Sequence, residues 1–243
     1  MDIATGKVEG RVERGVLSFK GIPYGRVAGR RFRPAGEVPP WPGIRLAHEY
    51  GPSSPQHSSG RPSPLAGALG RSAATRQSEE CLVLNIWTPD LNANARRPVM
   101  VWLHGGGYSS GSGSSSISDG TNLARHHDVI VVSLNHRLGP LGFLYLQHIA
   151  GDAYRDAGNL GSLDIVRALE WVRENIAAFG GDPGNVTIFG NSGGAGKVTH
   201  LMCMPRARGL FHRAILQSGV AIRSMTTEYA AQLTDELIAL CGI

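Results

Sequence analysis

Two short glycine-rich segments of the chain carry residue types that act together in acyl transfer. One reads GNSGG at residues 190–194 and fits the pattern G-x-S-x-G, and the other reads HGGG at residues 104–107. A serine hydroxyl becomes a nucleophile when a base takes its proton, and successive glycines let backbone N–H groups converge on a developing oxyanion. The two segments together predict a serine nucleophile beside an oxyanion hole.

The position of Ser192 in the chain strengthens this prediction. The GNSGG segment directly follows the apolar run VTIF at residues 186–189, which reads as a buried strand. A serine between a strand and a helix is held in a tight, strained turn, and its flanking glycines are needed because a β-carbon would collide with neighbouring backbone. An ordinary glycine turn is the alternative explanation, but the preceding strand favours Ser192 as the nucleophile.

The HGGG segment follows a second apolar run, VMVWL at residues 99–103. We expect the backbone N–H groups of Gly106 and Gly107 to be oxyanion donors, joined by the N–H of Gly193, the residue after the nucleophile. A glycine-rich phosphate-binding loop is the competing interpretation. It fails because no Lys-Ser or Lys-Thr follows and no G-x-G-x-x-G opens a helix there.

Short apolar runs elsewhere predict the elements that position these two segments. Strands are expected at residues 82–87, 99–103, 129–134, 186–189 and 213–218, and their continuous apolar character is typical of strands buried on both faces. Between the third and fourth runs, apolar residues recur at helical spacing and stop at Gly180 and Gly181. Strand, crossover helix and strand predict an α/β fold with a mostly parallel central sheet and flanking helices.

Length and composition favour one folded domain over residues 1–243. The chain is 42% hydrophobic and 18% charged, as in an ordinary globular protein. Residues 1–27 alternate apolar and polar positions and predict a small peripheral antiparallel meander. Residues 28–77 are rich in Pro, Gly, Arg and Ser and predict an irregular covering segment, which leaves residues 78–243 to form the core sheet and helices.

Charge and cysteine usage disfavour several classes of protein. The net charge of +5 is scattered among acids with no basic run, which argues against nucleic-acid binding. Cys81, Cys203 and Cys241 lie far apart without a CxxC, so we expect free thiols and neither a metal site nor a disulfide framework. No apolar run has the length of a signal peptide or a membrane span. We therefore expect a cytoplasmic protein with no metal and no membrane partner.

Five longer stretches form a recognisable set when they are taken in order. They read SEECLVLNIWTP, VMVWLHGGGY, VIVVSLNHRLGPLGFL, ALEWVRENIAAFGGDPGNVTIFGNSGG and GLFHRAILQSG. Together they resemble the type-B carboxylesterase and cholinesterase family over residues 7–219. The resemblance implies the α/β-hydrolase fold, a serine esterase that acts on a small-molecule ester, and no cofactor. It also implies that Ser192 is the nucleophile and that Gly106, Gly107 and Gly193 are the oxyanion donors.

The same resemblance implies supporting residues and shows two departures. Ser218 matches a family serine close to the catalytic serine, and Arg31 and Glu79 match a structural ion pair. Family members most often carry an acidic residue before the nucleophile and an alanine after it, where this chain has Asn191 and Gly193. Asn191 is neutral, so this chain lacks a negative charge that relatives carry beside the site. The backbone N–H of Gly193 can still act as an oxyanion donor.

Two further positions differ from many relatives. His136 stands where many of them carry tyrosine, and we interpret it as structural. Cys81 occupies a position that is disulfide-bonded in secreted relatives, but no upstream cysteine exists here to pair with it. This favours a reducing compartment.

The acid and the histidine that would complete a catalytic triad are not found after Ser192. His200 lies eight residues further along the expected helix, about 12 Å of rise away, which is too far for a hydrogen bond. His212 lies just before an expected buried strand and reads as a packing residue. In this fold the acid and the histidine follow the serine at later strand ends, so we expect both beyond Ile243. The chain is then a truncated esterase or one half of an enzyme completed by a C-terminal half-chain.

The end of the chain supports the same expectation. The run at residues 213–218 is apolar enough to be a central strand, yet only a helix-like stretch at residues 226–240 follows it. A central strand left at an edge exposes unpaired backbone groups and invites aggregation or pairing with another chain.

Two other functions remain open from the sequence. One is a non-catalytic adhesion or binding module, since neuroligin-like proteins use the same fold, although such a scaffold has no need of an exposed, strained serine. The other is hydrolysis of an amide, carbamate or lactone at the same site. The first half of that mechanism is shared with an esterase, so the sequence does not separate them.

Overall fold

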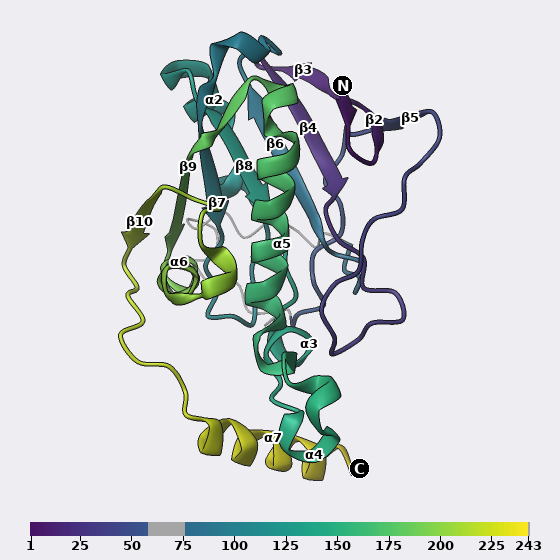
Figure 1. The fold of residues 1–243 in the computed structure, drawn as a ribbon, viewed down its shortest axis with the longest axis vertical. Coiled ribbons are helices and arrows are strands. Elements are labelled where there is room, and N and C mark those ends of the chain that lie inside the picture. The colour runs from purple at the N-terminus through teal and green to yellow at the C-terminus, as the bar shows by residue number, and fades with distance from the viewer. Residues whose placement is uncertain (58–75, 243) are drawn as a thin grey trace.

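The computed structural model describes residues 1–57 and 76–242 and is built on a seven-stranded sheet (Figure 1). The strand order is β10-β9-β7-β8-β6-β4-β3. The strands are β3 (Arg11–Glu13), β4 (Val16–Pro23), β6 (Val83–Thr88), β7 (Arg97–Leu103), β8 (Ile130–Leu134), β9 (Gly181–Asn191) and β10 (Arg213–Gln217). All five strands expected from apolar runs are present in this sheet.

The sheet has a parallel half and an antiparallel half. Strands β10, β9, β7 and β8 run parallel, whereas β6, β4 and β3 pair antiparallel. The predicted α/β architecture is confirmed, but its antiparallel part is larger than the sequence indicated. The reason is that β6 is buried at every position, as a parallel strand would be, and burial on both faces carries no information about strand direction.

The N-terminal strands differ in part from the expected peripheral meander. β1 (Asp2–Ile3) and β2 (Gly6–Glu9) pair antiparallel in a small second sheet, which β5 (Ile44–Leu46) joins in parallel. β3 and β4 instead join the central sheet, because β4 buries Val16, Phe19 and Ile22 against it. Only the first part of residues 1–27 is therefore peripheral.

The segment expected to be irregular is described only in part. Residues 28–57 contain the short strand β5 and otherwise run without a named helix or strand. Residues 58–75, which the same prediction covers, lie outside the described residues. The expected ion pair between Arg31 and Glu79 is present, with Arg31 Nε donating to Glu79 Oε2 at 2.9 Å.

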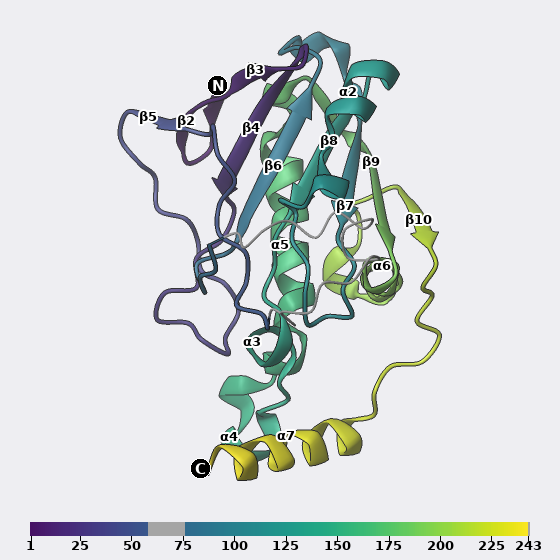
Figure 2. The same ribbon diagram turned by 180° about the vertical axis from the view of Figure 1, so that it is seen from behind.

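Helices cover both faces of the central sheet. α5 and α6 lie on one face and α2 lies on the other, as the two opposite views show (Figures 1 and 2). The helices are α2 (Thr121–His127), α3 (Gly139–Phe143), α4 (Gln147–Ala150), α5 (Leu160–Asn175), α6 (Gly193–Cys203) and α7 (Thr227–Cys241). The apolar positions that predicted α5 are all fully buried in the core, namely Ile165, Ala168, Leu169, Val172 and Ile176.

A buried ion pair fastens α5 to the loop that follows β8. Arg137 donates from Nε to Asp164 Oδ2 at 2.8 Å and from Nη2 to Oδ1 at 2.6 Å, and its Nη1 reaches the carbonyl oxygen of Arg33 at 2.7 Å. Both side chains are almost completely buried. A buried pair of this kind costs desolvation but is costly to break, so it holds α5 in one position against the sheet.

The C-terminal part of the chain leaves apolar surface open to solvent. β10 forms the edge of the described sheet, and Ile215 in its middle is 42% exposed. The predicted C-terminal helix is present as α7, capped at its start by the Thr226 hydroxyl, and it contacts the α4 region through a Thr234 bond to the Tyr145 carbonyl at 2.8 Å. The large apolar side chains exposed between β10 and the end of α7 include Val220, Ile222, Met225, Tyr229 and Leu240.

The structure also bears on the expected free thiols and on the search for membrane-spanning helices. Cys81, Cys203 and Cys241 are all free, as expected, and burial raises the pKa of the Cys81 thiol to about 12. Among the helices of the described ranges, none has the length and apolar character needed to cross a membrane.

Candidate active site

Ser192 lies in a strained turn between the end of β9 and the start of α6. Its φ of 55° and ψ of −122° are rarely adopted by a residue with a side chain, and such a conformation costs on the order of 1–3 kcal/mol. The turn is held on both sides, because Ser192 N–H donates to the Gln217 carbonyl at 2.8 Å and the Ser192 carbonyl accepts from Gly196 N–H at 3.1 Å. Ser192 is exposed to solvent at the carboxyl ends of the parallel strands.

The start of α6 presses closely against the end of β7. A methyl group on Gly194 would lie 2.1 Å from the carbonyl oxygen of Leu103, which is far inside van der Waals contact. Only glycine allows this approach. The contact brings the Ser192 turn next to the HGGG segment, although the two are about 85 residues apart in the chain.

The three glycines predicted as oxyanion donors lie together. A methyl group on Gly193 would lie 2.7 Å from the backbone nitrogen of Gly107 and 3.6 Å from that of Gly106. Gly106 and Gly107 both have positive φ, at 101° and 59°, which turns successive backbone groups away from the ordinary strand direction. Backbone N–H groups gathered beside a serine in this way can stabilise the oxyanion of a tetrahedral intermediate.

The peptide groups that carry these N–H donors are anchored at their carbonyl ends. His104 Nδ1 lies 2.8 Å from the carbonyl oxygen of Gly105, and since a carbonyl only accepts, the ring carries its proton on Nδ1. This bond fixes the peptide whose N–H belongs to Gly106. The next peptide is fixed because the Gly106 carbonyl accepts from the backbone N–H groups of Ser109 at 3.2 Å and Ser110 at 3.1 Å.

His104 stacks on a second buried histidine, His136. The ring centroids are 4.9 Å apart and the planes differ by 8°. Burial lowers the pKa of His104 to about 3, with a smaller contribution from the charge of Lys197, and burial lowers the pKa of His136 well below its ordinary value. Both rings are therefore neutral at physiological pH, and His136 is a structural residue as interpreted from the sequence.

A lysine that the sequence analysis did not single out lies beside this pair. Lys197 on α6 is completely buried, and its Nζ donates to the carbonyl oxygen of His104 at 2.9 Å. The same Nζ lies 5.5 Å from the centre of the Tyr108 ring. Burial lowers the pKa of Lys197 to about 7. The helical spacing of α6 gave no signal of this role, because it depends on a contact across 93 residues of sequence.

The two supporting residues lie next to the Ser192 turn. Asn191 Nδ2 donates to the Gln217 carbonyl at 3.3 Å, which ties the end of β9 to the end of β10. Ser218 follows Gln217 with a φ of 56°, and the chain then continues so close that a methyl group on Gly219 would lie 2.4 Å from the Ser192 carbonyl oxygen. The backbone at Ser218 is thus part of the wall around the turn.

The two histidines that follow Ser192 have other partners. The His200 ring stacks on Tyr108 at 5.8 Å, and its Nε2 lies 3.4 Å from the Ser224 hydroxyl. His212 Nδ1 accepts from Val186 N–H at 3.1 Å, in the middle of β9. Six residues of strand, about 20 Å, separate Val186 from Ser192. The structure therefore does not bring His212 to Ser192.

The amino-acid sequence of the chain matches the model of a known protein family. Residues 1–242 match the profile of the carboxylesterase family. The chain belongs to that family. It spans about half the length of the curated relatives it matches, since 240 of its residues align with 47% of para-nitrobenzyl esterase from Bacillus subtilis.

The sequence likeness to individual carboxylesterases is high. The identity to para-nitrobenzyl esterase from Bacillus subtilis is 47% over 98% of this chain, and that to phenmedipham hydrolase from Pseudarthrobacter oxydans is 44% over 88% of this chain and 41% of the relative. Among solved structures, an esterase from Clostridium hathewayi that hydrolyses aliphatic aromatic polyesters is 43% identical. It superposes with a TM-score of 0.91 over 100% of this chain and 48% of its own. The α/β-hydrolase fold expected from the resemblance is confirmed.

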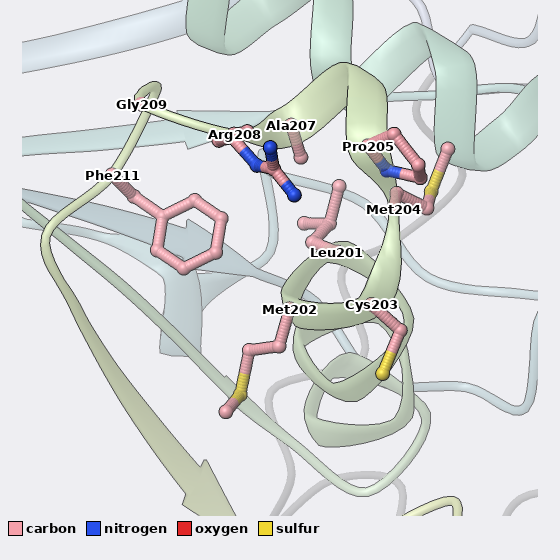
Figure 3. Close-up of a pocket in the computed structure, with 9 residues that line it drawn as sticks. All are labelled: Leu201, Met202, Cys203, Met204, Pro205, Ala207, Arg208, Gly209 and Phe211. Atoms are coloured by element: carbon pink, nitrogen blue, oxygen red, sulfur yellow. The ribbon is translucent and has the colours of Figure 1, made fainter.

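A shallow pocket of about 150 Å³ lies elsewhere, at the C-terminal end of α6 (Figure 3). Its lining comes from the end of that helix and the turn after it, and its apolar side chains include Met202, Cys203, Met204 and Phe211. Neither Ser192 nor the HGGG segment lines it. We therefore assign the site to the Ser192 turn and not to this pocket.

The lowered pKa of Lys197 predicts how stability depends on pH. Between pH 7 and about 10.5 the unfolded chain keeps a proton on this lysine that the folded chain has lost, so the free energy of unfolding should rise with pH across that interval. Lys197→Met should remove this contribution, which amounts to at most about 1.4 kcal/mol per pH unit.

Urea unfolding of both proteins at several pH values in this interval measures the effect. The difference between the two curves isolates Lys197, because Cys81 and Tyr24, whose pKa values burial raises, are common to both. Parallel curves would show that Lys197 does not titrate there.

Proposed function

We propose that this chain is the nucleophile-bearing part of a serine ester hydrolase. The observation that carries the proposal is the strained Ser192 turn, which lies beside the backbone nitrogens of Gly106 and Gly107 and the start of α6 at Gly193. A strained serine costs folding free energy, and an adhesion scaffold gains nothing from it. Membership of the carboxylesterase family and the names of the relatives support the same activity.

The proposed reaction proceeds through an acyl-enzyme. Ser192 Oγ attacks the ester carbonyl while its proton passes to a base, and the N–H groups of Gly106, Gly107 and Gly193 hold the resulting oxyanion. The intermediate collapses, the bond between the acyl carbon and the alcohol oxygen breaks, and the alcohol leaves with the proton from the base. Water then attacks the acyl-enzyme in the same way, which releases the carboxylic acid and restores Ser192.

We infer that the base and its acidic partner come from a C-terminal segment, either a continuation of this chain or a separate half-chain. His104 and His136 are buried with lowered pKa values, and His212 pairs with Val186 in the middle of β9, about 20 Å from Ser192, so we assign the base to none of the three. The exposed edge strand β10 and the apolar side chains after it offer a surface for such a segment.

The substrate is a small-molecule ester, with the acyl and alcohol groups left open. The relatives carry the names of different substrates, among them para-nitrobenzyl ester and phenmedipham, so hydrolysis of an amide, carbamate or lactone at the same serine stays an alternative. Neutral Asn191 places no negative charge directly before the nucleophile, which disfavours a strong preference for cationic substrates. The cytoplasmic location inferred from the sequence stays a prediction.

A fluorophosphonate probe tests the assignment of the nucleophile. In protein that includes the C-terminal segment, the probe should label Ser192, and Ser192→Ala should abolish both labelling and hydrolysis of p-nitrophenyl acetate. Mass spectrometry of the labelled peptide identifies the modified residue. Labelling that persists in the Ser192→Ala protein would place the nucleophile elsewhere.

Replacing Gly107 by valine tests the oxyanion hole. A β-carbon there meets nothing within 4 Å, so the fold should survive, but a β-branched residue is strained at a φ of 59° and should displace the Gly107 N–H. We expect the turnover number for p-nitrophenyl acetate to fall about 10²-fold or more, which is the usual loss for one oxyanion donor.

Gly43→Val is the matched control for this change. Gly43 also has a positive φ, 69°, and open space around a β-carbon, and it lies far from Ser192 in the sequence and on no element of the site. It should lose some stability but keep its turnover number. Equal turnover in the Gly107→Val and wild-type proteins would remove Gly107 from the oxyanion hole.

Expression of residues 1–243 with and without the C-terminal segment tests the half-chain proposal. Alone, these residues should be poorly soluble and have negligible esterase activity, because β10 stays an open edge and no base reaches Ser192. Co-expression with the segment should restore solubility and turnover. A stable, fully active monomer of residues 1–243 would overturn the proposal.

A further inference from the structure

Lys197 is a buried amine without an acidic partner. It lies on α6, five residues after Ser192, and its side chain is fully buried. No carboxylate in residues 1–57 or 76–242 contributes to its pKa, which burial alone lowers. Burying an amine without a counter-ion lowers the stability of the fold, and an apolar side chain would avoid that cost. Proteins depart from the rules of stable packing mainly at functional sites, so a buried amine without a counter-ion points to a functional constraint.

The contacts of Lys197 bracket the glycine run of the oxyanion loop. Its Nζ donates to the carbonyl of His104, the residue before the run, and lies over the ring of Tyr108, the residue after it. Tyr108 itself has a φ of 64°, so the chain leaves the run through a second constrained residue. One side chain from the helix that begins at the nucleophile therefore holds both ends of the segment that supplies two oxyanion donors.

The bond to His104 also supports the orientation of that ring. His104 Nδ1 fixes the carbonyl of Gly105 and so the peptide of the Gly106 N–H, while its ring stacks on His136. Among the described residues, the titratable side chains that interact with the Lys197 amine are the His104 and His136 rings and the Tyr108 ring. Both histidines stay neutral, so neither places a second positive charge beside the amine.

We propose that Lys197 is a positioning residue of the oxyanion hole, which links the helix carrying Ser192 to both ends of the loop carrying Gly106 and Gly107. The catalytic part of this proposal rests on the proposed function of those residues. The loop-anchoring part does not, because it concerns only the contacts of Lys197 with His104 and Tyr108. Lys197 acts through the backbone it holds and does not touch the reacting atoms.

A pair of variants tests the anchoring independently of activity. Lys197→Met and Lys197→Gln have side chains of equal length, but only glutamine can donate a hydrogen bond toward the His104 carbonyl. Amide hydrogen exchange at residues 104–110 should rise about 10-fold or more in the methionine variant and less in the glutamine variant. Lys20→Met is the control, since Lys20 also lies near a tyrosine ring, Tyr50 at 4.8 Å, but on β4, and it should leave exchange in this loop unchanged.

The same variants in protein that includes the C-terminal segment test the catalytic part. Lys197→Met should lower kcat for p-nitrophenyl acetate about 10-fold with KM within about twofold, because a loosened oxyanion hole weakens binding of the transition state more than that of the substrate. Lys197→Gln should recover part of the lost kcat.

The outcomes separate this inference from the proposed function. Unchanged exchange at residues 104–110 in Lys197→Met would overturn it, whatever Ser192 does. Equal losses of kcat and equal falls in Tm in both variants would also overturn it, because they would show a general loss of stability. Turnover that survives Ser192→Ala would overturn the proposed function, while the exchange comparison would still decide whether Lys197 anchors the loop.

Discussion

The contact between the start of α6 and the end of β7 is the constraint on which the rest of the site depends. A methyl group on Gly194 would overlap the Leu103 carbonyl, and one on Gly193 would overlap the Gly107 nitrogen, so these backbones meet with no side chain between them. This approach lets the Ser192 turn and the glycine loop share one small volume. It also explains why the strained φ of Ser192 is tolerated, since the packed helix and strand leave the turn no other path.

The proposed oxyanion hole shows how a site made of backbone can still be rigid. N–H groups have no rotamers to lock, so their direction is set by whatever holds the other end of each peptide. Here the carbonyl of Gly105 is held by His104, and the carbonyl of Gly106 by the N–H groups of Ser109 and Ser110. Donors that are already oriented need no reorganisation when negative charge develops, which is the property that makes an oxyanion hole effective.

One part of the molecule encloses a packed core, and another part leaves apolar side chains exposed to solvent. The parallel strands, α5 and the buried Arg137–Asp164 pair enclose a continuous core, whereas β10 ends the described sheet with an exposed Ile215 and is followed by apolar side chains in solvent. The chain spans about half the length of its carboxylesterase relatives. The exposed edge of β10 lies next to the nucleophile candidate, because β10 pairs with β9 as far as Asn191, the residue before Ser192.

Features that depend on neighbours in the sequence could be read from the sequence by itself. The apolar period predicted α5, the helix-like stretch at residues 226–240 predicted α7, and a strand followed by GNSGG located the Ser192 turn. Features that depend on distant neighbours could not be read in this way. β6 would be buried on both faces whichever way it ran, so only its pairing with β4 and β8 determines that it is antiparallel. β4 belongs to the central sheet and not to the small peripheral one, because its apolar face packs there. Lys197 became part of the site only through a hydrogen bond to a residue 93 positions away, because burial of an amine is a property of the packed structure and not of the helix that carries it.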